Sequence, residues 1–77
     1  MMGDRMEFVT RSANDLGTAL AEFRTMRGTS QATLAERIAV HRTYLSKLEQ
    51  GELTTAIERL WAAFDSLGVD VVIRDRP

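Results

Sequence analysis

Apolar residues recur at three- and four-residue steps in four stretches of this 77-residue chain, which is the spacing of amphipathic helices. The pattern predicts helices over residues 12–28, 30–38, 41–50 and 55–67. Ser12 and Ser30 stand where a side-chain oxygen caps a first helical turn, and Thr55 with Glu58 forms a T-x-x-E capping box. Glycines stand at the ends of the first, third and fourth stretches, as is typical of helix termini. The chain is therefore predicted to be all-α over most of its length.

A short β-branched segment at 69–74, V-D-V-V-I-R, is the one strand that the pattern predicts. A strand without a partner in its own chain leaves backbone groups unpaired, so we expect it to pair with the same strand of a second copy in a two-fold homodimer. The alternative is a loosely packed tail. The expected organisation is a flexible N-terminal arm over 1–10, a helix-turn-helix domain over 11–68, and a dimerisation strand and tail over 69–77.

The second and third predicted helices are short, and residues 39–41 are all that joins them. Two helices of about two turns each cannot lie antiparallel along their full length with so short a linker, so they cross steeply in the helix-turn-helix geometry. On the third helix, the outward side chains share one face by their spacing, and all of them are polar or basic. They are Arg42, Thr43, Ser46, Lys47 and Gln50.

This outward face has the chemistry that a helix needs in the major groove of DNA. Arg42 and Lys47 are long donors suited to guanine N7 and O6, and hydroxyl groups adapt to bases or to phosphate. The amino end of the second helix, at Ser30 and Gln31, offers backbone N–H groups to a phosphate. On spacing alone, Arg42 and Lys47 fit equally well as solvated charges on a helix surface.

Two motifs carry a resemblance to a known family. S-Q-x-x-L-A-x-x-I at 30–38 and Y-L-S-K-L-E-x-G at 44–51 resemble the Cro/C1-type (XRE) helix-turn-helix family, and the similarity covers about residues 16–67. The segment at 65–73 resembles the HipB-type antitoxins, which are small dimers joined by C-terminal strands. The resemblance implies a repressor that binds an inverted-repeat DNA operator and also binds and neutralises a HipA-like serine/threonine kinase toxin. The alternatives are a stand-alone regulator of phage or restriction-controller kind and an interaction module without DNA binding.

The family pattern also implies roles for individual residues. Base contacts would concentrate at the start of the third helix and at Lys47, and Gln31 would contact phosphate and support that helix. Arg24 and Glu49 would form a structural ion pair between the first and third helices. The full set implied to contact DNA is Ser30, Gln31, His41, Arg42, Thr43, Ser46, Lys47 and Gln50. The set assigned to the dimer is Trp61, Phe64, Val69, Val71, Val72 and Ile73, with Trp61 and Phe64 fitting equally in the core.

The chain departs from the family pattern at two positions around the turn. Ala39 stands where the family usually has glycine, and because Ala adopts a positive φ only with strain, we expect the turn to be tightened differently. His41 replaces the usual Ser or Thr cap of the recognition helix. It is interpreted as a cap or a phosphate contact, with a pH switch as the alternative.

Composition excludes several other functions. The chain has no cysteine and one histidine, which argues against disulfides and against a metal centre. Ten basic and eleven acidic residues give a net charge of −1, so any DNA contact must come from a local patch. No apolar run is long enough to cross a membrane, and the N-terminal segment has no apolar signal core, so we expect a cytoplasmic protein. Since no nucleophile has a positioned base, we expect neither enzymatic activity nor a cofactor.

Overall fold

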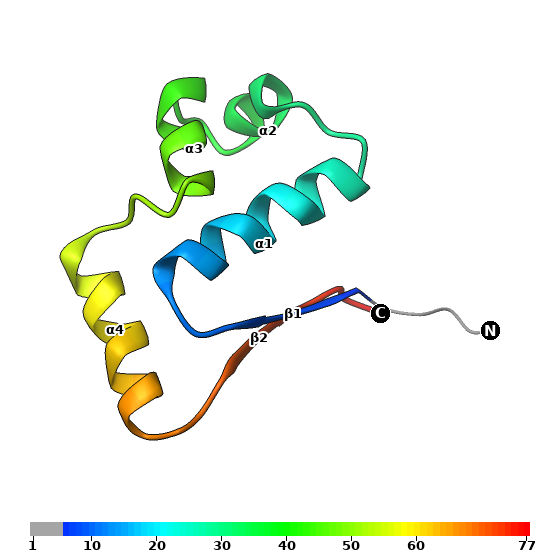
Figure 1. The fold of residues 1–77 in the computed structure, drawn as a ribbon. Coiled ribbons are helices and arrows are strands. Elements are labelled where there is room, and N and C mark those ends of the chain that lie inside the picture. Colours follow the sequence, from blue (N-terminus) through cyan, green and yellow to red (C-terminus); the bar gives the residue numbers. More distant parts are fainter. Residues whose placement is uncertain (1–5) are drawn as a thin grey trace.

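The computed structural model describes residues 6–77, which form four helices and two strands (Figure 1). In chain order these are β1 (Glu7–Thr10), α1 (Ala13–Met26), α2 (Gln31–Arg37), α3 (Arg42–Glu49), α4 (Thr55–Ser66) and β2 (Val71–Arg74). α1 lies between α3 and the small sheet and contacts both of them. The four helices lie where the hydrophobic pattern predicted them.

Side-chain caps start the helices. The Asp15 amide donates to Ser12 Oγ at 3.1 Å, and the Thr33 amide donates to Ser30 Oγ at 3.0 Å, as the sequence predicted. α4 begins at Thr55 as predicted, but the residue that caps it is Thr54 and not Thr55. Thr54 is extended, with φ −67° and ψ 156°, and its hydroxyl accepts from the Ile57 amide at 3.4 Å. Thr55 is already helical, so it does not form the capping box that its spacing suggested.

The C-terminal strand has a partner within its own chain, which corrects the sequence interpretation. β1 and β2 form a two-stranded antiparallel sheet in which Phe8 lies opposite Ile73 and Val9 opposite Val72. The strand itself is Val71–Arg74, shorter than the predicted 69–74. Residues 7–10 are therefore a strand and not part of a flexible arm, and residues 1–5 of that arm lie outside the described residues. β2 is therefore paired along one edge within its own chain, and pairing across a homodimer stays a prediction.

Thr10 joins the sheet to α4. It is 1% exposed, and its hydroxyl donates to the Val71 carbonyl at 2.7 Å while it accepts from Trp61 Nε1 at 3.1 Å. Trp61 is 8% exposed, and Phe64 meets it edge-on with ring centroids 6.4 Å apart. Trp61 is thus a core residue of its own chain, which is one of the two roles that the sequence left open for it. The buried indole N–H has the partner that such a group needs.

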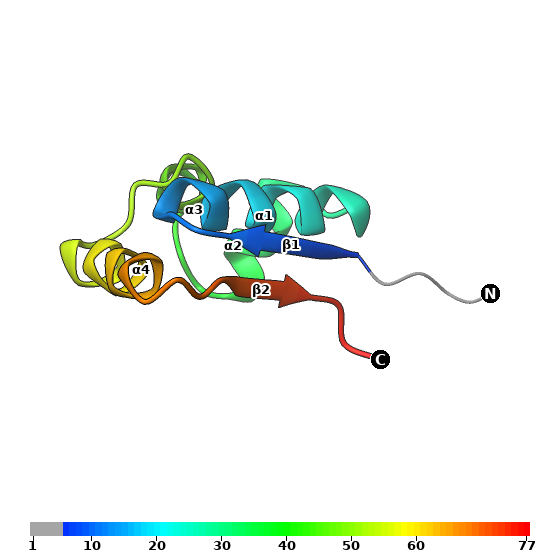
Figure 2. The ribbon, with the colours of Figure 1, turned by 60° about the horizontal axis from the view of Figure 1, so that its bottom comes forward.

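The molecule is thin for its width, with principal extents of 37 × 36 × 15 Å (Figure 2). So thin a body has little interior, and its buried apolar side chains are Ala19, Ala35, Leu45 and Trp61. Where β1 packs on α1, the ring of Phe8 lies against the ring of Phe23, with centroids 6.0 Å apart. Several large apolar side chains remain exposed as a consequence, most of them on α4, on the sheet and in the segment that joins α4 to β2.

Candidate nucleic-acid interface

α2 and α3 are joined by a tight turn centred on Ala39. Its φ is 60°, a left-handed conformation that L-residues other than glycine rarely adopt. The turn is closed by hydrogen bonds from the Ala39 amide to the Glu36 carbonyl at 3.2 Å and from the Val40 amide to the Ala35 carbonyl at 2.9 Å. The expectation that alanine would force a different turn was therefore wrong. Ala39 adopts the positive φ despite the strain, because the two hydrogen bonds hold the turn and so fix the crossing of α2 and α3.

His41 caps α3. Its backbone is extended, with φ −73° and ψ 143°, and its Nδ1 accepts from the Thr43 amide at 3.1 Å. This is the capping role that the sequence interpretation gave it, performed by a ring nitrogen in place of the usual hydroxyl. The cap fixes the point at which α3 begins, and so the direction in which its first residues project.

The outward face of α3 is polar and accessible. Arg42, Thr43, Lys47 and Gln50 are exposed, and Ser46 is half-buried and accepts from Gln50 Nε2 at 3.3 Å. The opposite side of the helix carries Leu45, which is fully buried at 0% exposure. The structure therefore brings together the α3 residues that the sequence assigned to base and backbone contacts. Tyr44 is 52% exposed beside them.

The two predicted DNA contacts at the amino end of α2 already form hydrogen bonds within the chain. Ser30 Oγ accepts from the Thr33 amide and donates to Thr33 Oγ1 at 2.9 Å, so its hydroxyl caps the helix. Gln31 is half-buried, and its Nε2 donates to Glu49 Oε1 at 2.9 Å. Gln31 thus supports the end of α3, as the family pattern implied, and this bond ties α2 to α3.

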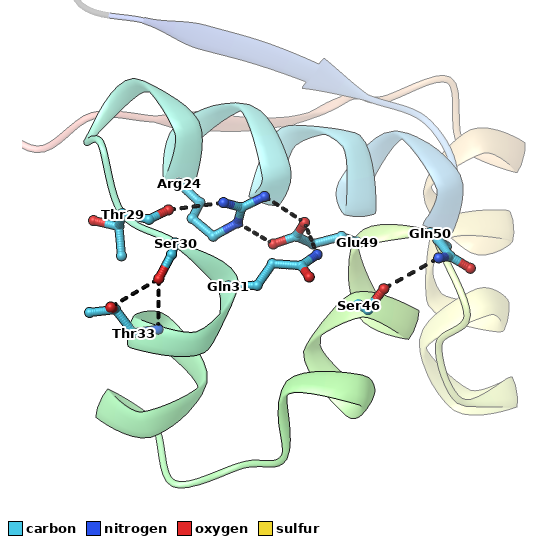
Figure 3. Close-up of polar contacts among 8 residues, drawn as sticks. All are labelled: Arg24, Thr29, Ser30, Gln31, Thr33, Ser46, Glu49 and Gln50. Atoms are coloured by element: carbon cyan, nitrogen blue, oxygen red, sulfur yellow. Dashed lines mark hydrogen bonds and ion pairs between the residues drawn. The ribbon is translucent and has the colours of Figure 1, made fainter.

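A partly buried ion pair joins α3 to α1 (Figure 3). Arg24 Nε and Nη2 donate to the two carboxylate oxygens of Glu49 at 2.6 and 3.0 Å, a bidentate geometry. Arg24 Nη1 also donates to the Thr29 carbonyl at 2.9 Å, just before α2. The Arg24 and Glu49 side chains are only 16% and 7% exposed. One guanidinium therefore holds α1, α2 and α3 in a fixed arrangement.

The same contacts set the electrostatics of the pair. Hydrogen bonding to Arg24 holds the pKa of the Glu49 carboxyl below its usual range. Burial acts in the opposite direction and raises this pKa, and the hydrogen bond from the Gln31 amide lowers it further. The bond to Glu49 likewise raises the pKa of Arg24. Both groups stay charged near neutral pH, so the frame beneath α3 does not titrate there.

Gly17 is a structural residue that the sequence analysis missed. A Cβ added there would lie 2.6 Å from the Leu48 carbonyl oxygen, 2.7 Å from the Gly51 nitrogen and 2.8 Å from the Glu49 carbonyl oxygen. α1 can approach the end of α3 this closely only because residue 17 has no side chain. The available signal was a glycine within a predicted helix, where alanine would be favoured by about 1 kcal/mol.

The structure places the residues assigned to a dimer in different surroundings, with Val71 half-buried on β2. Trp61 is buried, Phe64 is half-buried beside it, and Ile73 lines an open cavity against α1. Val69 and Val72 are each 48% exposed. Of the predicted set, these last two therefore remain largely available to a partner.

Comparisons with known proteins fit this geometry. A family model described as "Helix-turn-helix" matches residues 20–73, most of the chain and all of α2 and α3. Searches of curated proteins and of solved structures return no significant match. Within residues 6–77, no helix is long and apolar enough to cross a membrane, and no group of three or more acidic or histidine side chains is placed to hold a metal ion. The chain belongs to the Cro/C1-type (XRE) helix-turn-helix family and is a DNA-binding regulator of that type.

Proposed function

We propose that this protein is a transcriptional repressor that binds an inverted-repeat operator as a homodimer, with α3 of each copy in the major groove. The observation that supports this is the exposed polar face of α3 on a frame fixed by the Arg24–Glu49 pair. A recognition helix must hold its side chains in register with base edges, so rigidity below the helix is part of recognition. Binding requires no catalytic step and no cofactor.

The chemistry of the face assigns different tasks to its members. Arg42, in the first turn, reaches guanine N7 and O6 with two donors, and Lys47 offers a second cation one turn later. Thr43, Ser46 and Gln50 donate to bases or phosphate at the edges of the groove. Two copies related by a two-fold axis would place their helices in successive major grooves, about 34 Å apart.

We further propose that the repressor is the cytoplasmic antitoxin of a HipA-like serine/threonine kinase toxin. The support is the resemblance of residues 65–73 to HipB-type antitoxins. In the chain, this segment includes the end of α4 and most of β2, with Val69 and Val72 about half exposed. An exposed apolar surface of this kind is suited to a protein partner.

The DNA contact is tested by fluorescence anisotropy on the duplex upstream of the protein's own gene. Replacing Arg42 by Ala should weaken binding by about 5- to 150-fold, the range for loss of a base-reading Arg. Arg74→Ala is the matched control, because Arg74 is exposed on β2, on the far side of α1 from α3 (Figure 1). Equal affinity for the wild type and Arg42→Ala would show that α3 does not read the operator as proposed.

The partner is tested by tagging the protein in its native host, then identifying co-purified proteins by mass spectrometry and co-purified DNA by sequencing. A kinase-like protein together with the protein's own promoter supports the antitoxin. Promoter DNA without a protein partner overturns the antitoxin role and leaves a stand-alone regulator. A protein partner without DNA overturns operator binding and indicates an interaction module.

A further inference from the structure

A cavity of about 460 Å³ lies between α1, the last turn of α3 and β2. α1 contributes three apolar side chains at steps of four and three residues, so these share one side of the helix. With one side chain from α3 and one from β2 they form an apolar floor, and all five are half-buried: Leu16, Leu20, Phe23, Leu48 and Ile73. A cavity of this size and lining is in the range that takes small molecules.

The walls of this cavity are held by contacts within the chain. Gly17 and Ala19 line it and are too small to fill it. At one end, Arg27 pairs with Asp75 and so joins the end of α1 to the chain just after β2. Asp75 is fixed in turn, because its amide donates to the Met6 carbonyl at 3.2 Å and its Oδ2 accepts from the Met6 amide at 3.3 Å. A ligand therefore meets a preformed site and does not have to order it.

The charges around the cavity are mostly positive. Arg27, Arg74 and Arg76 line it, and Asp75, the one acidic residue of its lining, is paired with Arg27. Arg74 and Arg76 are exposed, and neither forms an ion pair within residues 6–77, although Glu7 lies opposite Arg74 in the sheet. The whole chain has a net charge of −1, so this positive cluster is local and favours an anion.

An apolar floor beside a positive edge fits one class of ligand better than others. An inorganic anion or a DNA phosphate would match the arginines but would gain nothing from the apolar floor. A molecule with an aliphatic chain and a carboxylate matches both parts, because the chain removes the floor from water and guanidinium groups donate to the carboxylate. A neighbouring cavity between α1 and α2 shares Leu20, Phe23 and Arg27 and adds Arg37, which extends the positive edge.

We propose that the cavity between α1 and β2 binds an aliphatic carboxylate, a fatty acid of medium chain length. Its chain lies on the apolar floor and its carboxylate meets Arg27, Arg74 and Arg76 at the edge. Gly17 and Leu48 line the cavity and also form the close contact between α1 and α3, so the ligand lies against the frame of the recognition helix. Binding is measured without DNA, and its outcome is therefore independent of operator binding.

The site is tested by isothermal titration calorimetry of the full chain with sodium decanoate and with 1-decanol, which has the same chain without the charge. The wild type should bind both. Replacing Arg74 and Arg76 together by Glu should weaken decanoate binding about tenfold, because two exposed attractive contacts become repulsive, and should change decanol binding little. Arg59→Glu is the matched control, since Arg59 is exposed on α4 and does not line the cavity, and it should bind decanoate like the wild type.

Two further measurements locate the ligand. Changes in backbone amide NMR shifts on addition of decanoate should concentrate in α1 and β2. Leu20→Trp should fill the cavity and abolish binding of both ligands, with the helix content of the wild type by circular dichroism. A wild type that does not bind decanoate, an equal loss for decanoate and decanol in the double variant, or shifts centred on α4 would overturn the site. Loss of decanoate binding as the chain self-associates at higher concentration would also overturn it and would assign the cavity to a second copy.

Discussion

Replacing Arg24 by Met removes the guanidinium that holds α1, α2 and α3 together. Glu49, 7% exposed, would keep the Gln31 amide but lose two charged hydrogen bonds of 2.6 and 3.0 Å, and the Thr29 carbonyl would lose its side-chain donor. Breaking a buried pair from one side typically costs about 3–5 kcal/mol. Because Arg24 is itself 16% exposed, we expect the lower end, about 3 kcal/mol.

That loss is large for a domain of this size. Typical stabilities per residue give a 77-residue chain about 4–12 kcal/mol in total. A loss of about 3 kcal/mol should lower Tm by about 12–24 °C for a domain in this size class. Urea and thermal unfolding followed by circular dichroism measure both quantities on the same samples.

Arg27→Met is the matched control at the C-terminal end of the same helix. Arg27 pairs with Asp75 at the surface, where the two side chains are 63% and 23% exposed, so its loss should cost about 1 kcal/mol or less. In a double-mutant cycle with Glu49→Gln, the combined Arg24 variant should be much less destabilised than the sum of the single variants. A cost for Arg24→Met below about 1 kcal/mol, or strictly additive effects, would refute the role assigned to this pair.

Three further predictions follow from the same frame. Gly17→Ala should lower Tm, because the added Cβ would lie 2.6 Å from the Leu48 carbonyl oxygen, and this clash outweighs the helix propensity of alanine. A higher Tm would contradict the close approach of α1 to α3. Ala39→Gly should raise the unfolding free energy by roughly 0.5–1 kcal/mol, since relief of a positive φ exceeds the entropic cost of glycine; no gain would show that the turn is unstrained. The depressed pKa of Glu49 means that the folded chain binds fewer protons there than the unfolded chain. Its contribution to stability is therefore complete above the unfolded pKa of about 4.3 and is lost as pH falls through the lower folded value. Urea titrations of the wild type and Glu49→Gln from about pH 6 to about pH 3 should show this loss in the wild type alone, and parallel curves would contradict it.

Local signals explain why the helices could be predicted from sequence. Caps such as Ser12 and Ser30 act within three residues of themselves, and the apolar period of each helix is complete within its own stretch. The cap of α4 was assigned to Thr55 and not to Thr54 because two adjacent threonines are equally good caps in sequence. The backbone conformation of Thr54 decided between them.

Long-range pairing explains the main error. β1 has four residues, too few for an alternating pattern to stand out, and its partner lies more than sixty positions away, as the Thr10–Val71 bond shows. Without β1, β2 looked unpaired and Trp61 looked available to a second copy. The polar bridge through Thr10 that buries Trp61 depends on three elements meeting, which no local pattern encodes.

The candidate site was likewise predictable only in part from the sequence. The outward face of α3 followed from helical spacing, and the Arg24–Glu49 contact followed from the family resemblance. The bond from Gln31 to Glu49 and the close approach at Gly17 depend on how α1, α2 and α3 pack, so only the structure shows them.

The most direct test of sequence-specific recognition by α3 is selection of bound duplexes from a random DNA library, followed by sequencing. The wild type should enrich an inverted repeat whose half-site centres lie about one helical turn, or a multiple of it, apart. Arg42→Ala and Lys47→Ala should each relax the preference at particular symmetric positions while the rest of the repeat persists. A library that shows no enrichment with the wild type, or an enriched sequence that neither variant alters, would contradict recognition by this helix.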